Sequence, residues 1–405
     1  MQRLNHIILL IFFLAVASPT CAYAQADTPY YIYGVSAPDS ITVDSTATNV
    51  PEATAETDAE KLTLKKKLKR TGSLVKRFIK SFDDYDTTYI SPNYYNYEAM
   101  VQNTNFYQIY RIRGKSEDGT SQTLQLKPTP SLRIGPYFGY RWIFLGYTFD
   151  IGHPKRAGES TQFNLSLYSS MLGCDLVLIR NKGDFTIGRV KGFDDATTRA
   201  VRNLSFDGME ARTTSFNLYY VFNHRHFSYP AAFAQSTVQR KSCGSWMLGF
   251  NFVRQKIEFD YTRLPDALIT PDAETGQMPL IDELKFSRVD YRSYNINFGY
   301  AYNWVFARNF LFTVSLTPAI SFKHEKGQRI TGDQIWQNIR SFNFDFIGRS
   351  AIVWNNTRYY AGASLVTHVF DYRHNRYTIN NFINYINIYV GLNFYKRRQY
   401  RTPKH

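Results

Sequence analysis

The segment "SYNINFGYAYNW", residues 293–304, alternates between two kinds of side chain. Every second position is apolar or aromatic: Tyr294, Ile296, Phe298, Tyr300, Tyr302 and Trp304. The positions between them carry only Ser, Asn, Gly or Ala. Successive side chains of a strand point to opposite faces, so this pattern predicts a β-strand with one apolar and one polar face. It excludes a helix with a coherent apolar face.

The same alternation recurs along most of the chain. It is clear in "FLFTVSLTPAISF" (310–322), "FNFDFIGRS" (342–350) and "YINIYVGLNF" (385–394). Together these patterns predict about twelve strands, an even number. They lie near residues 105–113, 129–140, 142–151, 160–169, 172–180, 210–222, 243–254, 288–304, 309–323, 338–353, 356–371 and 378–395.

The predicted connections alternate in length. Long segments follow the odd-numbered strands, for example residues 181–209 and 255–287, whereas very short ones follow most of the even-numbered strands. One connection, residues 223–242, is long although it falls on the side of the short turns. Short turns on one side and long loops on the other are typical of outer-membrane barrels.

The composition of the polar face identifies the solvent on each side. A soluble sandwich would carry many Lys and Glu on its wet face, but this face is Asn, Ser, Thr, Gly and Ala with few charges. We therefore predict an all-β fold, a transmembrane antiparallel β-barrel with lipid against its aromatic face. The predicted lipid-facing residues are Ile296, Phe298, Tyr300, Phe312, Phe344 and Ile388. The predicted lumen-facing residues are Asp150, Asn295, Asn297, Asp345 and Arg349.

The N-terminal region differs in composition from the strands. Residues 1–24 combine a basic start, an apolar stretch and "AYA", which indicates a secretory signal peptide. A polar tether is predicted at 25–59, a basic amphipathic helix at 60–82, the barrel at 83–395 and a basic tail at 396–405. These features predict the cell outer membrane as the location, with both termini in the periplasm.

The net charge limits the classes of molecule that the protein could bind, and the positions of the cysteines indicate whether they form a disulfide. The chain of 405 residues has a net charge of +15, with a run of Lys and Arg in residues 61–80. In an exported protein such a run favours anionic lipid headgroups over nucleic acid. Cys174 and Cys243 fall on opposite faces of their strands by parity, so we expect two free thiols.

Candidate chemistry is sparse. His224, His226 and Ser228 in "NHRHFS" are the one candidate for a hydrolase or metal site, because some outer-membrane barrels are lipolytic. An orienting acid or a third ligand is missing nearby, so hydrogen-bonded polar residues of a structured connection are the competing interpretation. No phosphate loop, Cys-x-x-Cys pair or His-Glu-x-x-His motif occurs, and the sequence predicts neither a cofactor nor a metal.

Two segments resemble a known family. "FDDYDTTYI" (82–90) and "YVFNHRHFSYPAAFAQSTVQRKSCGSW" (220–246) are similar to the signature regions of an uncharacterised outer-membrane β-barrel family of Bacteroides-type bacteria, domain of unknown function 4421. The resemblance implies a barrel in the outer membrane over most of residues 82–395. It implies no activity.

The sequence leaves three functions open. The first is a barrel without a catalytic site, serving as a narrow or plugged channel, a ligand-binding protein or a structural or assembly component. The second is a membrane-embedded hydrolase or acyltransferase, and the third is an anchor that docks a periplasmic partner through the basic helix. Outer-membrane lipid and the barrel-assembly machinery are the expected partners. We also expect residues 60–82 or 223–242 to enter the periplasmic mouth, with Lys or Arg near Asp150, Asp290 and Asp345.

Overall fold

A computed structural model describes most of the predicted barrel. The described residues are 21–25, 85–140, 143–146, 148–152, 160–271, 279–329, 335–374 and 377–401. The predicted tether and basic helix lie outside these residues, as does most of the predicted signal peptide.

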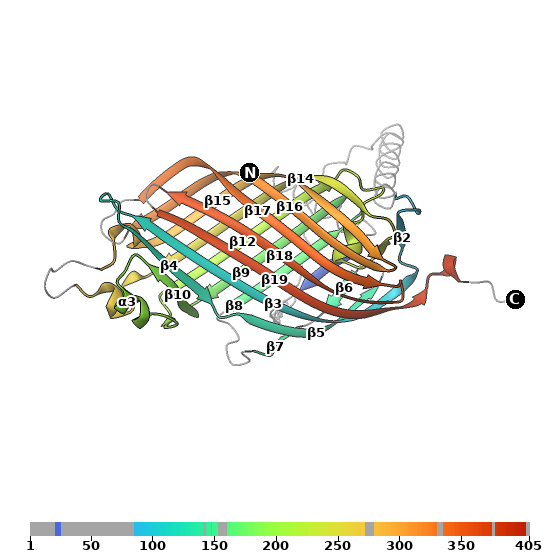
Figure 1. The fold of residues 1–405 in the computed structure, drawn as a ribbon, viewed down its shortest axis with the longest axis horizontal. Helices are drawn as coiled ribbons and strands as arrows, with labels where there is room; N and C mark the ends of the chain where they lie inside the picture. Colours follow the sequence, from blue (N-terminus) through green and yellow to red (C-terminus); the bar gives the residue numbers. More distant parts are fainter. Residues whose placement is uncertain are drawn as a thin grey trace, which may run out of the picture. The chain divides into compact units, whose positions relative to one another are not determined.

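The described chain folds into one large sheet of long strands, most of them antiparallel to their neighbours in the sequence (Figure 1). Each of the twelve predicted segments overlaps at least one strand. These strands are β3 (Tyr95–Lys115), β5 (Ser131–Tyr140), β6 (Ile143–Gly146), β7 (Phe149–Asp150), β8 (Ser160–Tyr168), β9 (Leu172–Lys182), β12 (Met209–Val221), β14 (Cys243–Phe259), β15 (Phe286–Ala307), β16 (Phe310–Arg329), β17 (Ile335–Asn355), β18 (Tyr359–His374) and β19 (Tyr377–Lys396).

The sheet curls until its first and last long strands meet. β3 pairs with β19 along nearly their whole length, from Tyr95 opposite Lys396 to Gly114 opposite Tyr377. The two ends of the sheet differ. The end that carries the β3–β4, β14–β15, β16–β17 and β18–β19 connections is called the loop end here. The opposite end, with the tight β8–β9, β15–β16 and β17–β18 connections, is called the turn end.

The remaining side of the sheet is built from shorter strands. At the loop end, β4 (Ser121–Pro128) lies between β3 and β10 (Phe185–Lys191), and β10 also pairs with the short β11 (Ser205–Phe206). Toward the turn end, β6, β7 and β8 occupy the space between β5 and β9. The backbone of β1 (Cys21–Gln25), which overlaps the predicted signal peptide, pairs with β6 and β8.

The sheet contains 17 strands, more than the predicted count of about twelve. The difference arises mainly at the loop end, where segments predicted as loops are paired strands. Residues 114–128 contain β4, residues 181–209 contain β10 and β11, and most of 324–337 extends β16 and β17. Both faces of these extensions lack the aromatic alternation that marks the other strands, so the pattern gave no strand signal there.

Burial follows the alternation predicted for the opening segment. On β15, Ser293, Asn295, Asn297 and Asn303 are all at most 3% exposed, whereas the intervening apolar residues from Tyr294 to Trp304 are 40–56% exposed. The polar face therefore points to the inside of the curled sheet and the aromatic face points outward.

Helices are short in this fold. They are α3 (Asp195–Ala200), α4 (Pro230–Phe233), α5 (Asp266–Ile269) and the 3-10 turns η1 (Tyr261–Arg263), η2 (Asp282–Leu284) and η3 (Arg398–Tyr400). In the described part of the chain, none has the length and hydropathy of a membrane-crossing helix. A separate two-stranded sheet joins β2 (Ile90–Pro92) to β13 (Thr237–Gln239).

Candidate functional site

The connection between β12 and β14, residues 223–242, folds into the concave side of the sheet at its turn end and is called the inserted segment here. It contains α4 and β13. Pro at the first position of α4 suits a helix start, because its missing N–H would have no partner there. Phe227, Tyr229, Ala231 and Ala232 are all buried. They pack on Tyr219, Met247, Leu311 and Val353, which come from four different strands of the wall.

Several hydrogen bonds fix the inserted segment to the wall, and three of them come from its middle part. The Tyr229 hydroxyl is 2.6 Å from Ser315 Oγ on β16. Gln235 Nε2 donates to the Tyr389 hydroxyl on β19 at 2.7 Å. Asn303 Nδ2, on β15, donates to the Ser228 carbonyl at 2.9 Å. These three pairs are uncharged, while Arg240 Nη1 donates a further, charged hydrogen bond to Asn309 Oδ1 at 3.2 Å. The segment is therefore held mainly by apolar packing and neutral hydrogen bonds.

Gln239 organises the inserted segment from within. Its side chain is buried and bridges two parts of the segment, because Nε2 donates to the His226 carbonyl at 2.6 Å and Oε1 accepts from the Ser228 N–H at 2.9 Å. β13, which carries Gln239, pairs with β2. The short strand β2, which precedes β3 in the chain, therefore stabilises the inserted segment by pairing with it.

A buried ion pair lies above the inserted segment. The Arg349 guanidinium on β17 pairs with Asp175 on β9, across the interior, at 2.5 Å. It also lies 5.3 Å from the ring centre of Tyr219 and 5.9 Å from that of Tyr229. Asn217 donates to the same carboxylate at 3.0 Å. Asp175 thus has two polar partners, as a buried charge requires.

A second buried ion pair lies nearer the loop end. Lys323 Nζ is 3.3 Å from Asp345 Oδ1, and both side chains are almost completely buried. Ser321 Oγ donates to the same carboxylate at 2.9 Å and Asn295 Nδ2 at 3.3 Å. Asp175 and Asp345 are thus each matched by one cation from another strand of the wall.

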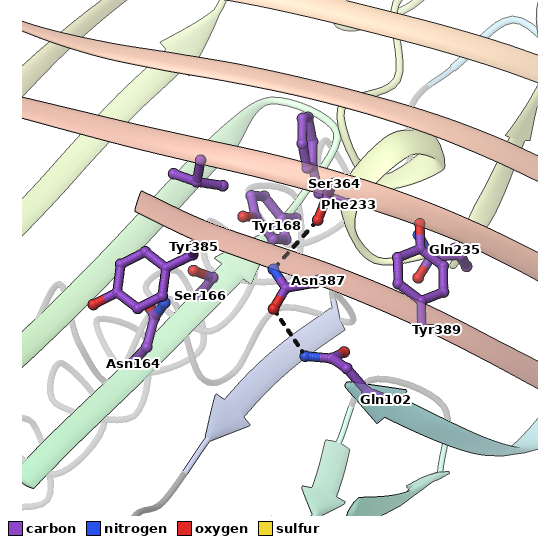
Figure 2. Close-up of a pocket in the computed structure, with 11 residues that line it drawn as sticks. Gln102, Asn164, Ser166, Tyr168, Phe233, Gln235, Ser364, Tyr385, Asn387 and Tyr389 are labelled. Carbon is purple, nitrogen blue, oxygen red and sulfur yellow. Dashed lines mark hydrogen bonds between the residues drawn. The ribbon is translucent and has the colours of Figure 1, made fainter. Parts of the chain in front are cut away.

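A small cavity remains beside the inserted segment (Figure 2). Its volume is about 50 Å³, enough for a few water molecules. Most of its lining is polar or aromatic and includes Gln102, Asn164, Ser166, Asn387 and Tyr389. Figure 2 shows Asn387 between Gln102 and Ser364, bonded to both. A site of this size suits water rather than an organic substrate.

Aromatic and aliphatic side chains fill the interior at the loop end. Phe286 stacks on Phe259 at 5.0 Å and on Tyr377 at 5.5 Å, and Tyr291 stacks on Tyr372 at 4.6 Å, between ring centres. They belong to one buried cluster with Leu124 and Leu126 of β4, Phe185 and Ile187 of β10, and Leu268 of α5. The interior is therefore packed at both ends in the described chain.

The structure separates the three candidate catalytic residues. Ser228 Oγ is 2.6 Å from Thr237 Oγ1 and accepts from the Ala231 N–H. His224 Nδ1 lies 3.3 Å from the Val221 carbonyl. The hydrogen bonds of the described residues join neither histidine to Ser228. The arrangement of a nucleophile and its base, proposed for the hydrolase alternative, is not formed.

His226 instead faces the residues just before β2. Its Nε2 is 3.5 Å from Asp86 Oδ2, and its ring meets that of Tyr89 edge to face. A hydrogen bond from the Thr88 backbone N–H holds the pKa of Asp86 below its usual value, and a hydrogen bond from the Thr88 side chain contributes less. Among the described residues, no group of three His, Cys, Asp or Glu side chains is placed to hold a metal ion.

The residues predicted for the two faces of the wall differ in burial. Asn295, Asn297, Asp345 and Arg349 are buried, and Asp150 is half-buried, its Oδ1 accepting from the Gly152 N–H. Ile296, Phe298, Tyr300, Phe312 and Ile388 are exposed on the outer side. The side chain of Phe344 lies outside the described residues. Both Cys174 and Cys243 are free thiols, as expected.

For Asp290 and Asp345, the charge contacts expected from the inserted segment are wrong, whereas the predicted helix at 60–82 lies outside the described residues. Asp345 pairs with Lys323, and Asp290 pairs with Arg254 at 2.9 Å, so both cations come from wall strands and not from the inserted segment. Sequence reasoning missed Asp175, Lys323, Tyr229 and Gln235 as interior residues. A single signal pointed to Asp175, a lone acid on the polar side of "GCDLVL".

These features define a curled, mainly antiparallel sheet with an apolar exterior and a filled interior, which is polar in its middle part and apolar at the loop end. The chain belongs to the family described as "Domain of unknown function (DUF4421)", whose model matches residues 84–394. No curated protein matches the chain significantly.

Among solved structures, similarity is distant. The outer membrane protease OmpT from Escherichia coli is 9% identical, with a TM-score of 0.35 over 75% of this chain and 98% of that chain. The translocator domain of autotransporter NalP from Neisseria meningitidis is 8% identical, with a TM-score of 0.27 over 82% and 98%. The P. putida toluene transporter TodX is 7% identical, with a TM-score of 0.25 over 75% and 91%.

Proposed function

We propose that the protein is an outer-membrane β-barrel whose lumen is plugged by the inserted segment. In this proposal the exposed aromatic face contacts lipid, the buried polar face lines the lumen, and the barrel has no catalytic site. Its resting state does not conduct ions, and its role is structural or depends on release of the plug.

The main support for the proposal is the height of the band of apolar side chains on the outer face of the sheet. On β15 the exposed apolar side chains run from Tyr294 to Phe306, and the next outward residue toward the loop end is Arg292. At about 3.3 Å per residue, twelve steps span roughly 40 Å along the strand. A tilt of about 45° reduces this to roughly 28 Å, close to the hydrocarbon thickness of a bilayer.

Neighbouring strands support the same boundary. On β14 the outward residues change from Trp246, Leu248 and Phe250 to Arg254, which pairs with Asp290. Charged side chains are unfavourable in hydrocarbon but suit the headgroup region, so the change marks the edge of the proposed membrane. Because long connections in such barrels face the cell exterior, we place the loop end outside and both termini in the periplasm.

Single-channel conductance of the folded protein in planar bilayers tests the plug. The wild-type protein should show few and small openings. A variant in which Tyr229 and Gln235 are both replaced by Ala loses the contacts to β16 and β19, and we expect more frequent or larger openings. A variant with the exposed Lys241 replaced by Ala keeps those contacts and serves as the control. A large, steady wild-type conductance would contradict the proposal.

A further inference from the structure

An open groove lies on the outside of the sheet at its loop end. Its volume is about 1040 Å³, far larger than the interior cavity. It is formed where β3, β4 and β10 run side by side, with the end of α3 and the residues after it along one edge. This is the place where β4 pairs directly with β10, above the shorter β6–β8 region.

Six cationic side chains line the groove. They are Arg111, Arg113, Lys127, Arg189, Lys191 and Arg202. The other lining residues are Ser121, Thr123, Gln125, Gly188, Val190, Thr198 and Asn203, so the lining contains no carboxylate. All six cations are exposed. Their charges add, and the groove should attract anions.

The six cations differ from three other outward-facing arginines of the sheet, which form ion pairs. Arg180, Arg254 and Arg373 pair with Glu210, Asp290 and Asp371. Among the described residues, no ion pair involves a cation of the groove. Arg113 Nε donates to Ser121 Oγ at 3.0 Å, and the Arg111 guanidinium lies 5.5 Å from the ring centre of Phe382. These contacts orient the two side chains without neutralising them.

The backbone keeps the groove open. The pairing of β10 with β4 is irregular between Ile187 and Val190, where β10 bulges. Gly188 lies at this bulge, and a Cβ added there would come within 2.8 Å of Lys127 Cε. A bulge changes the direction of nearby side chains, and here it accompanies Arg189, which lines the groove.

The groove begins where the outward apolar side chains end. Along β3 the outward positions include the exposed Tyr97, Val101 and Tyr107, with the half-buried Asn103 and Asn105 between them, and then Arg111 and Arg113. Tyr107 and Arg111 are separated by about 13 Å along the strand, at about 3.3 Å per residue. A molecule with an apolar tail beside the aromatic residues would therefore place its headgroup among the cations.

We propose that this groove binds the phosphate groups of an anionic glycolipid of the outer leaflet. The inference rests on the proposed membrane placement, which puts the loop end outside. Arg favours phosphate because its guanidinium can donate two parallel hydrogen bonds, and four of the six cations are Arg. The hydroxyl and amide side chains of the lining can donate to further phosphate or sugar oxygens.

Binding to purified lipid A in nanodiscs of phosphatidylcholine tests the proposal. We expect the diphosphorylated form to bind at least about tenfold more tightly than its dephosphorylated counterpart. The variant R111Q/R189Q/R202Q, which loses one charge from each side of the groove, should lose that difference. The matched variant R180Q/R254Q/R373Q removes the same number of outward guanidiniums, all from ion pairs, and should keep it.

Three outcomes would overturn the inference. The first is equal binding of both lipid forms, and the second is an equal loss in the two triple variants. The third is competition by inorganic pyrophosphate at the affinity of the lipid, which would assign the groove to a soluble phosphate. Insertion into the nanodiscs is scored separately for each protein. Failure to insert would reject the membrane placement, whereas insertion without a phosphate preference rejects the groove alone.

Discussion

The buried Arg349–Asp175 ion pair gives a prediction about stability, because each of these charges depends on the other for compensation. Removing one partner of a buried pair leaves the other without compensation and costs about 3–5 kcal/mol. We expect Arg349→Met to lower the free energy of unfolding by that amount, measured by urea titration of the protein folded into lipid vesicles. The double variant with Asp175→Asn should recover much of the loss. Equal losses in the single and double variants would show that the pairing itself contributes little.

The outward register of β15 gives a second prediction for single residues. Phe298 is 52% exposed and Asn297 is 3% exposed, although they are neighbours. If Phe298 faces hydrocarbon, Phe298→Arg should destabilise the folded protein by about 2–4 kcal/mol. A matched change to Gln, which has no charge, should cost less. The same vesicle titration distinguishes the two, and similar values for Arg and Gln would contradict lipid contact at this position.

Sequence alternation predicted which residues are exposed and which are buried on β15, but not their partners. Asn297 is hydrogen bonded to Asn217, and Asn217 to Asp175, through three strands of the wall. Asp175 and Arg349 are 174 residues apart and meet across the interior. A local pattern reports the face of a strand and contains no information on which strand lies opposite, so these contacts required the structure.

At the scale of elements, the sequence marked the inserted segment by its exceptional length and by its family resemblance, but did not show how it is held. Its order depends mainly on packing and on neutral hydrogen bonds, and its few charged contacts are at exposed side chains, so its release should respond weakly to salt. We expect the conductance change of the Tyr229→Ala, Gln235→Ala variant to be similar at about 0.1 M and 1 M salt after correction for bulk conductivity. A strong decrease of that change at high salt would instead indicate that ion pairs hold the plug.

The strands at the loop end could not be predicted from the sequence. Twelve segments with aromatic alternation were found from sequence, because the two faces of these strands differ sharply in burial and polarity. β4 and β10 lack this contrast. Lys127 and Arg189 face water on one side, and Leu126 and Ile187 enter a buried cluster on the other, over only a few residues. Such short alternation resembles that of an ordinary polar loop.

At the scale of the whole molecule, the proposed orientation places the loop end outside the cell. In a background with Cys174→Ala and Cys243→Ala, a single cysteine at Asp118 lies in the β3–β4 turn of the loop end. A cysteine at Arg308 lies in the β15–β16 turn of the turn end. An impermeant maleimide added to intact cells should label the first and not the second. The reverse result would invert the orientation.

The pairing of β4 with β10 also affects how the exterior would be recognised by other molecules. It places residues 121–128 beside residues 185–191, which are far apart in the sequence, on a folded rim above the proposed membrane. An antibody raised against either peptide alone should bind intact cells poorly, because each strand is fixed in the sheet. Antibodies raised against the folded protein should bind well. The outer face of this protein would then present discontinuous epitopes rather than linear ones.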